Sequence, residues 1–203
     1  RNAGGRVTGV EIKGVREEPF NGNQHGVGLY AYADQDTAQT LVVSNCYIHD
    51  FQKNGTALNG SGLTAEISDC VIEGAGPTRI TAQNGIQVGW GARGTIGPNN
   101  LVSSVSYTPS DWVASGILLY GSADVTVLTN TVTDAQAGIY AYGGDALIQG
   151  NSVSVLNGLG TEVYYGIVDP PPAPLASPVE ESGVARLADG LMAQDSSWRD
   201  RKS

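Results

Sequence analysis

The chain has 203 residues, a formal net charge of −9, 40% hydrophobic residues and 15% charged residues. This balance is typical of a folded globular protein rather than a disordered one. The acidic excess argues against a nucleic-acid partner, because a phosphate backbone is bound by clustered Lys and Arg side chains. No stretch approaches 18 apolar residues, so we expect no transmembrane segment. The chain begins at Arg1 without a methionine or a signal peptide, which indicates a processed or trimmed product.

A six-residue pattern recurs five times and predicts a short strand at each place. Every copy contains a glycine that is followed by apolar or Thr residues two positions apart, and a period of two is typical of a β-strand. We expect these glycines to allow a turn with positive φ at the start of each strand. The copies occupy residues 25–30, 54–59, 84–89, 115–120 and 137–142, and a weaker sixth copy lies at 165–167.

A second predicted strand follows each of the five copies. Its apolar residues lie three before and two after a small polar residue, the pivot, at which we expect a tight bend. Asn side chains stacked at such a bend can hydrogen-bond their neighbours above and below. These strands occupy residues 43–48, 67–72, 96–101, 127–132 and 148–153, and their pivots are Cys46, Cys70, Asn99, Asn130 and Asn151.

The spacing between the two strand types predicts a solenoid. From each glycine to the next pivot the separations are 20, 15, 14, 14 and 13 residues, whereas from each pivot to the next glycine they are 9, 15, 17, 8 and 15. A nearly constant arc can stack, while the variable arc forms loops along one edge. We therefore predict an all-β fold, a right-handed parallel β-helix of about six coils over residues 1–169. Its loops are 50–54, 73–84, 102–115 and 133–137.

The same frame predicts which apolar side chains point into the solenoid. They are Val43, Ile48, Ile67, Ile72, Ile86, Val88, Ile96, Ile117, Leu119, Val127, Val132, Ile139, Ile148 and Val153.

The two cysteines, Cys46 and Cys70, are predicted on adjacent coils, within the range of a disulfide. Both a disulfide and two stacked free thiols fit the frame, and parallel side chains favour free thiols. We expect no metal there, because no His or carboxylate is in register with them.

The C-terminal part departs from the repeat. Residues 170–178 form a Pro-rich linker, where a β-helix must end because Pro cannot donate to a ladder. Residues 179–203 form a tail in which Val184, Leu187, Leu191 and Met192 recur at the spacing of a short amphipathic helix. This helix can cap the solenoid or dock on a neighbouring subunit, so a homo-oligomer or larger assembly is possible.

Aromatic residues are the predicted binding candidates. Outward positions of the glycine-containing strands hold Tyr30, Asn59, Gln87, Tyr120, Tyr140 and Tyr142. We expect Tyr120, Tyr140 and Tyr142 to form one exposed patch, with Tyr107 and Trp112 on a nearby loop. Such side chains suit sugar rings and protein interfaces alike, although Tyr is also simply a good exposed strand residue.

Residues 84–96, 115–120 and 130–139 resemble the right-handed β-helix repeat family, which includes pectate-lyase-like folds, NosD-like periplasmic proteins and many secreted bacterial proteins. The resemblance covers residues 7–169. It implies the fold but no single function, because the same repeat carries lyases, hydrolases, epimerases and inert scaffolds. For a polysaccharide lyase it would imply clustered acidic Ca²⁺ ligands with an Arg or Lys base, and for a galacturonan hydrolase an Asp pair with a neighbouring His.

No such catalytic arrangement is evident from the sequence. Asp50, Asp111 and Asp134 fall in predicted loops, and Asp69 lies beside a pivot. The densest group is His49 and Asp50 with Lys53, and neighbouring loops could bring Asp111 and Asp134 together. Solvated loop charges explain these residues as well.

We therefore expect a non-catalytic extracellular, cell-surface or periplasmic β-helix module for assembly or adhesion, without a cofactor. It would bind a glycan or a protein subunit through its loop edge. The alternative is a carbohydrate-active enzyme, namely a polysaccharide lyase, hydrolase or epimerase, with Ca²⁺ if it is a lyase.

Overall fold

The computed structural model describes residues 2, 4–108, 112–155 and 165–168. The predicted linker at 170–178 and the predicted helical tail at 179–203 lie outside these residues. The described part is all-β and contains no helix, so none that could span a membrane. Its strands are β1 (Gly5–Thr8), β2 (Glu11–Ile12), β3 (Val27–Tyr32), β4 (Gln39–Ser44), β5 (Tyr47–His49), β6 (Asn54–Asn59), β7 (Leu63–Ser68), β8 (Val71–Thr78), β9 (Asn84–Gly89), β10 (Arg93–Ile96), β11 (Leu101–Tyr107), β12 (Ser115–Leu128), β13 (Thr131–Ala135), β14 (Ala137–Gln149), β15 (Ser152–Val155) and β16 (Tyr165–Val168).

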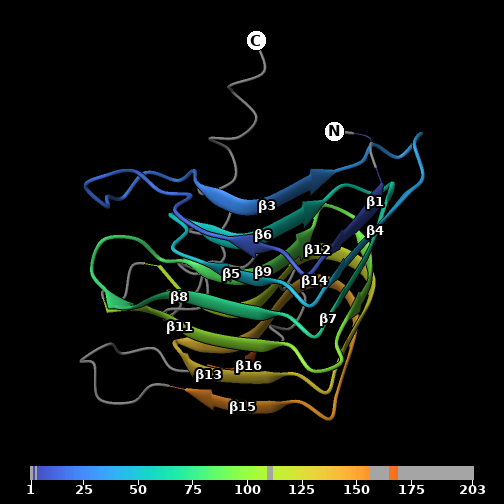
Figure 1. The fold of residues 1–203 in the computed structure, drawn as a ribbon. Coiled ribbons are helices and arrows are strands. Elements are labelled where there is room, and N and C mark those ends of the chain that lie inside the picture. The colour runs from blue at the N-terminus through green and yellow to red at the C-terminus, as the bar shows by residue number, and fades with distance from the viewer. Residues whose placement is uncertain (1, 3, 109–111, 156–164, 169–203) are drawn as a thin grey trace, which may run out of the picture.

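The strands form two sheets in which every described pair is parallel. The first sheet has the order β1-β4-β7-β10-β12-β9-β6-β3, with β14 beside β12 and β16 beside β14. The second has the order β15-β13-β11-β8-β5-β2. The long strand β12 pairs with β9 through its first half and with β10 through its second half, so the first sheet bends around the core. Figure 1 shows the turns of the chain stacked from β3 at one end to β15 at the other.

The core lies between the sheets and contains the residues that the repeat frame places inside. The register aligns Thr56, Ile86, Ile117 and Ile139 on four neighbouring strands. Of the 14 residues predicted inside, 12 are buried in one cluster, while Ile148 and Val153 are partly buried against it. The parallel pairing of the glycine-containing strands is also as predicted.

The bend between the strands of three neighbouring turns is held by a ladder of side-chain amides. Asn100 Nδ2 donates to Asn130 Oδ1 at 2.8 Å, and Asn130 Nδ2 donates to Asn151 Oδ1 at 2.9 Å. The Cys70 backbone N–H donates to Asn100 Oδ1 at 3.0 Å, so the ladder continues into the cysteine positions. Stacked turns lie about 4.8 Å apart, which lets each amide bridge to the next.

The predicted pivot of the third turn, Asn99, is wrong by one residue. Asn99 is exposed, has a φ of 61° and donates to Asp69 Oδ1 at 3.0 Å, whereas the buried ladder position belongs to Asn100. This turn has one more residue between the core residue Ile96 and its pivot than the other turns have. Consequently Leu101 points outward and Val102 enters the core.

Both cysteines are buried free thiols on neighbouring turns. Cys70 Sγ lies 3.4 Å from the Cys46 backbone nitrogen, in the position that an Asn oxygen occupies further along. Burial raises the pKa of the Cys70 thiol to about 11, so this thiol is protonated and unreactive near neutral pH.

Three of the repeated glycines, Gly55, Gly85 and Gly116, serve close packing rather than a positive φ, whereas Gly26 has the expected positive φ, of 84°. A Cβ on Gly85 would lie 2.4 Å from Val102 Cγ1 and 2.6 Å from the Gly116 carbonyl oxygen, and Gly55 and Gly116 are equally confined. None of these three has a positive φ. In the first copy the glycine aligned with Gly55 is Gly28 rather than the predicted Gly26. The register shows this, because Val27 pairs with Asn54, the residue before Gly55.

Buried glutamines at the start of these strands form a second support that the repeat frame does not predict. Gln83 Nε2 donates to the Phe51 carbonyl at 2.8 Å, and Gln136 Oε1 accepts from the Ala114 N–H at 2.9 Å. Each therefore satisfies backbone groups of the preceding turn where strand pairing stops.

Candidate functional site

Two of the predicted binding aromatics are part of the interior. Tyr107 is buried in the main core cluster, and Trp112 is partly buried against that cluster. The first part of the predicted loop 102–115 is strand, since β11 extends to Tyr107, and the Tyr107 side chain lies inside. Tyr107 therefore offers almost no exposed aromatic surface, and Trp112 offers only part of its ring.

The other three tyrosines form one cluster on the outer face of the first sheet. Tyr120 and Tyr142 stack with ring centroids 5.5 Å apart, and Tyr140 lies 6.4 Å from Tyr142. Trp90, which the sequence analysis did not single out, lies 5.3 Å from Tyr120. The predicted exposure is wrong, however: Tyr140 is only 1% exposed and Tyr120 only 7%.

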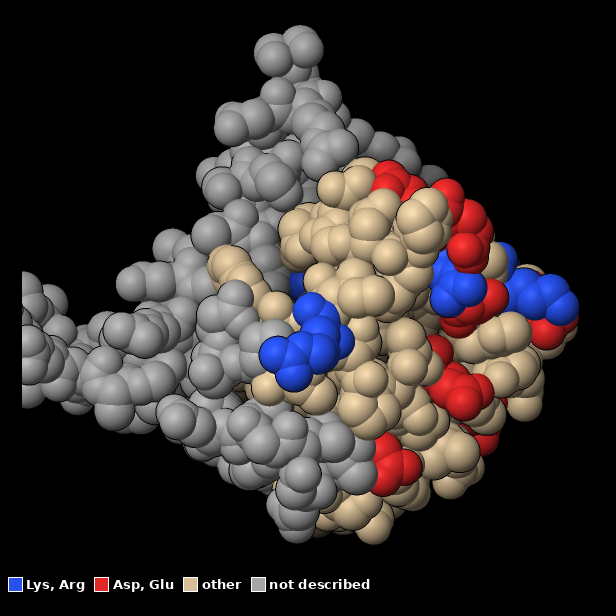
Figure 2. Space-filling model, turned by 90° about the vertical axis from the view of Figure 1, so that its left-hand side faces the viewer, with Lys and Arg blue, Asp and Glu red and all other residues tan. Residues whose placement is uncertain are grey.

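The variable connections lie together along one side of the two sheets, here called the loop edge (Figure 1). Val15 pairs with Phe51, Gln52 N–H donates to the Val15 carbonyl, and Thr108 N–H donates to the Thr78 carbonyl. Parts of the predicted loops 73–84 and 133–137 are strands β8 and β13. Figure 2 faces this edge and shows that its acidic side chains gather on one part of the described surface, with basic ones among them.

A shallow hollow of about 340 Å³ lies within this charged part. It is lined by Arg16, His49, Asp50, Phe51, Glu73, Gly74 and Ala75. Arg16 is held by two carboxylates, Asp50 at 3.0 Å and Glu18 at 2.8 Å. The guanidinium also lies 5.7 Å from the Phe20 ring centroid, which further fixes its position.

Tyr47 and His49, both on β5, border the hollow from the outer face of the second sheet. Their rings stack 4.2 Å apart. The Tyr47 hydroxyl donates to Glu73 Oε2 at 2.7 Å, and His49 Nε2 lies 3.2 Å from Glu11 Oε1. The bond to Glu73 raises the pKa of Tyr47, because it stabilises the protonated phenol. Hydrogen bonds from Lys13 and then His49 lower the pKa of Glu11.

An exposed apolar column continues from Tyr47 along the second sheet. Tyr47 pairs with Val71, which pairs with Leu101, and their exposed fractions are 37%, 37% and 38%. In the neighbouring column His49 pairs with Glu73. The face thus presents an apolar row next to a polar row. We call Glu11, Arg16, Tyr47, His49, Asp50 and Glu73 the loop-edge site.

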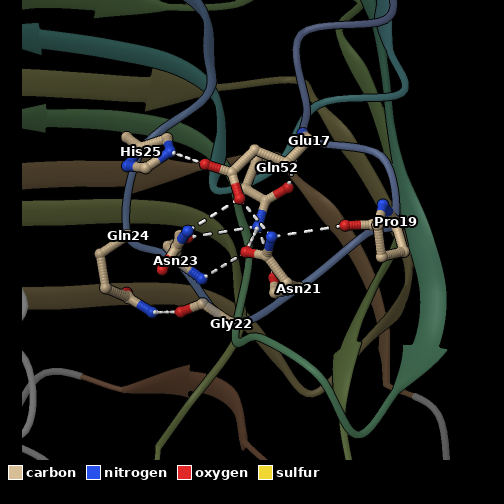
Figure 3. A network of polar contacts seen from close by, with 8 residues as sticks. All are labelled: Glu17, Pro19, Asn21, Gly22, Asn23, Gln24, His25 and Gln52. Carbon is tan, nitrogen blue, oxygen red and sulfur yellow. Dashed lines mark hydrogen bonds and ion pairs between the residues drawn. The ribbon is translucent and has the colours of Figure 1, made fainter.

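Beside the hollow, a polar network fixes the segment that follows Arg16 (Figure 3). The Glu17 carboxylate accepts from Asn21 and from Asn23 Nδ2, the latter at 2.8 Å, and lies 2.5 Å from His25 Nε2. Gln52 joins this network through Asn21 Oδ1 at 2.8 Å. Hydrogen bonds from Asn21, His25 and Asn23 lower the pKa of Glu17, so it stays ionised and holds the segment against the adjacent turn.

The predicted catalytic candidates are only partly brought together. His49 and Asp50 line the hollow, but Lys53 is buried and its Nζ donates to the Ala82 carbonyl instead. Burial lowers the pKa of Lys53 to about 7. Asp134 is exposed with a φ of 53°, and Asp111 lies outside the described residues.

Sequence reasoning missed Glu11, Arg16, Tyr47 and Glu73. For Tyr47 and Glu73 a signal exists, since positions one and three after each pivot face outward. For Arg16 there is none, because its segment precedes the first repeat. Among the described residues no group of three or more His, Cys, Asp or Glu could hold a metal ion.

Comparison with known proteins identifies no relative. No protein-family model matches the chain, and no curated protein or solved structure matches it. Function must therefore be argued from the residues themselves.

Proposed function

We propose that this chain is a right-handed parallel β-helix module of an extracellular or cell-surface protein, and that it binds a neutral glycan at the loop-edge site without chemistry. The fold proposal is supported by parallel strands that pair one turn apart around a single core and by the amide ladder at one bend. Such a scaffold positions its loops rigidly, which suits them for binding.

The observation that carries the glycan proposal is the exposed row of Tyr47, Val71 and Leu101 beside carboxylates. The apolar face of a sugar ring packs on an aromatic side chain, while its hydroxyls need acceptors at the edge. Glu73 and Asp50 supply such acceptors, and Arg16 supplies a donor.

The charges of the site favour a neutral glycan over a uronate. The carboxylates of Glu11, Glu18, Asp50 and Glu73 face the cations of Lys13 and Arg16, so acid exceeds base by two when the histidines are neutral. A polyuronate would be repelled. The side chains that could act as catalytic acids or bases are already paired with one another. His49 contacts Glu11, and Arg16 contacts Asp50 and Glu18.

The test is a neutral-oligosaccharide array followed by calorimetry on the best ligand. Replacing Tyr47 with Ala should weaken binding about tenfold, the equivalent of about 1.4 kcal/mol of stacking. Tyr30→Ala is the matched control, because Tyr30 is 40% exposed on the other sheet. Absence of glycan binding, or equal affinity of the Tyr47→Ala variant, would contradict the proposal.

The second candidate is a glycoside hydrolase, which one observation favours: Asp50 and Glu73 line the same hollow. Hydrolysis needs one carboxyl group to protonate the leaving oxygen and a second to activate water or attack the sugar. Release of reducing ends that is lost in both Asp50→Asn and Glu73→Gln would select this function over simple binding.

A further inference from the structure

The stack of turns has an open strand edge at each end (Figure 1). One end is formed by β1, β2 and β3, and the other by the second half of β14 with β15 and β16. Among the described residues each of these segments pairs with a strand on one side only. An open edge presents backbone N–H and C=O groups that can pair with a strand of another chain. These strands contain no proline and few charged residues, so little in their sequence blocks such pairing.

Three columns of core side chains run from one end of the stack to the other. The register gives the columns Leu29-Thr56-Ile86-Ile117-Ile139-Ile167, Val7-Val43-Ile67-Ile96-Val127-Ile148 and Ile12-Ile48-Ile72-Val102-Val132-Val153. Every residue inside a column is buried. The residues that end the columns are less covered: Ile167 is 53% exposed, and the other five are partly buried. Each column therefore has an incompletely covered apolar side chain at both ends.

The two ends also fit each other in strand order. Strands β6, β7 and β8 of one turn pair with β9, β10 and β11 of the next. By the same pairing β1 and β2 are equivalent to β7 and β8, but no described strand lies on the free side of β3. At the other end β16 is such a strand, since it pairs with the first half of β14. Placing β16 of one copy on β3 of a second copy also brings the second half of β14 onto β1, and β15 onto β2.

The backbone around β3 is already arranged for a strand at this place. The Asn2 N–H donates to the Tyr32 carbonyl at 2.8 Å, just as the Ala33 N–H donates to the Asn59 carbonyl one turn further on, at 3.1 Å. Ala33 directly follows β3, which pairs with β6. Asn2 therefore occupies the position that follows a strand paired with β3.

The charges of the two ends are compatible with this stacking. If the columns continue in the same register, Leu147 faces Arg6 and Ser152 faces Glu11. Asp145 lies two residues before Leu147 and is exposed, as is Arg6. Opposite charges at such a diagonal position of neighbouring strands attract each other. No like charges of the described strands are placed opposite one another.

We propose that copies of this chain stack end to end, with the end that carries β16 of one copy on the end that carries β3 of the next. Ile167 then packs on Leu29, Ile148 on Val7, and Val153 on Ile12. Two different surfaces meet, so repetition of the contact builds an open filament rather than a closed dimer. The six strands β1, β4, β7, β10, β12 and β14 lie about 4.8 Å apart, which gives an axial repeat of about 29 Å per copy.

The test is sedimentation velocity of the full chain over a range of concentrations, with electron microscopy of the largest species. We expect the wild type to form species that grow with concentration, up to filaments with the axial repeat given above. Ile167→Lys should raise the concentration needed for assembly at least tenfold, because a charge replaces an apolar contact. The matched control is Ile80→Lys, since Ile80 is 46% exposed between β8 and β9, in the middle of the stack. This control should assemble like the wild type.

A mixing experiment distinguishes end-to-end stacking from unspecific apolar association. Val7→Lys should block the opposite end, so this variant and Ile167→Lys should each be monomeric alone. Mixed in equal amounts they should form a 1:1 dimer, because each keeps one working end. If Val7→Lys does not fold, Arg6→Asp replaces it, since Arg6 is exposed and its reversed charge would repel Asp145.

Three results would overturn the proposal: a wild type that stays monomeric or stops at a dimer at every concentration, an Ile167→Lys variant that assembles like the wild type, or a mixture without the 1:1 dimer. The contact uses the ends of the stack, whereas the loop-edge site lies on its side. The stacking therefore stands or falls independently of the proposed glycan binding.

Discussion

The buried lysine gives a sharp prediction about stability and pH. Lys53 is 5% exposed, and its pKa is lowered from 10.5 to about 7 by burial alone. No described carboxylate forms an ion pair with it, and its Nζ donates only to the Ala82 carbonyl. Replacing Lys53 with Met keeps the apolar stem and removes the ionisable group.

The direction in which stability changes with pH follows from the difference in proton binding between the folded and unfolded states. Between about pH 7 and 10.5 the unfolded state binds a proton that the folded state has released, so the wild-type stability rises with pH across this window. Below pH 7 both states are protonated and the folded protein carries the full cost of a buried charge. The fall of the Lys53 pKa from 10.5 to about 7 corresponds to a cost of about 5 kcal/mol as an upper bound.

The assay is urea unfolding of wild type and Lys53→Met at pH 6, 7.5, 9 and 10. We expect Lys53→Met to be the more stable protein at pH 6, by up to a few kcal/mol after the lost hydrogen bond to Ala82 is subtracted. That advantage should shrink steadily towards pH 10. Lys13→Met, at an exposed lysine with a 60% exposed side chain, is the control. A stability difference that does not change with pH would refute the reasoning.

Three further substitutions test the packing. Asn130→Ala should lower the free energy of unfolding by about 1–3 kcal/mol, because Asn100 and the Ile96 carbonyl lose a buried partner. Thermal melting checks this. The control is Asn99→Gly, because Asn99 is exposed with a φ of 61° that Gly also adopts, and it should change the stability by less than about 0.5 kcal/mol. Gly85→Ala should lower the free energy of unfolding by about 1–3 kcal/mol, since a Cβ would lie 2.4 Å from Val102 Cγ1. Urea unfolding measures this, and an unchanged urea midpoint would show that neighbouring turns can move apart to make room for the methyl group. Tyr140→Ser should cost about 3–5 kcal/mol because the ring is fully buried, so a normal melting temperature would mean that the outer face is not packed.

Much of the fold could be predicted from the sequence, because equivalent positions of stacked turns have the same environment and therefore need the same kind of residue. A residue such as Ile117 must face the core in the same way as Ile86 and Ile139, so its apolar character recurs at one place in each copy. The amide ladder is predictable for the same reason. Its one misplaced rung, Asn99 for Asn100, arose where Gly97 and Pro98 accompany an added residue, and two adjacent asparagines fit the pattern equally well.

The sequence predicted correctly which way the strand tyrosines point, but it did not predict how much of each side chain is exposed. Strand alternation correctly placed Tyr120 and Tyr140 off the core, but alternation says nothing of what packs against that face. Tyr107 was misplaced for a different reason: it was expected on the loop 102–115, but strand β11 continues to it and its side chain enters the core. Gln83 and Gln136 were missed because a Gln with backbone partners in the preceding turn looks, in the sequence, like any polar loop residue.

The proposed loop-edge site illustrates why a candidate binding surface on a repeat scaffold is difficult to predict from the repeat pattern. Tyr47 and Glu73 occupy regular outward positions, and the register alone puts Glu73 beside His49. Arg16, in contrast, comes from a segment that precedes the first copy and is fixed by Asp50 and Glu18. A repeat frame can predict the platform, but the irregular segment folded over it determines which charges face a ligand. Substitutions that distinguish function from scaffold are therefore best placed where the repeat breaks.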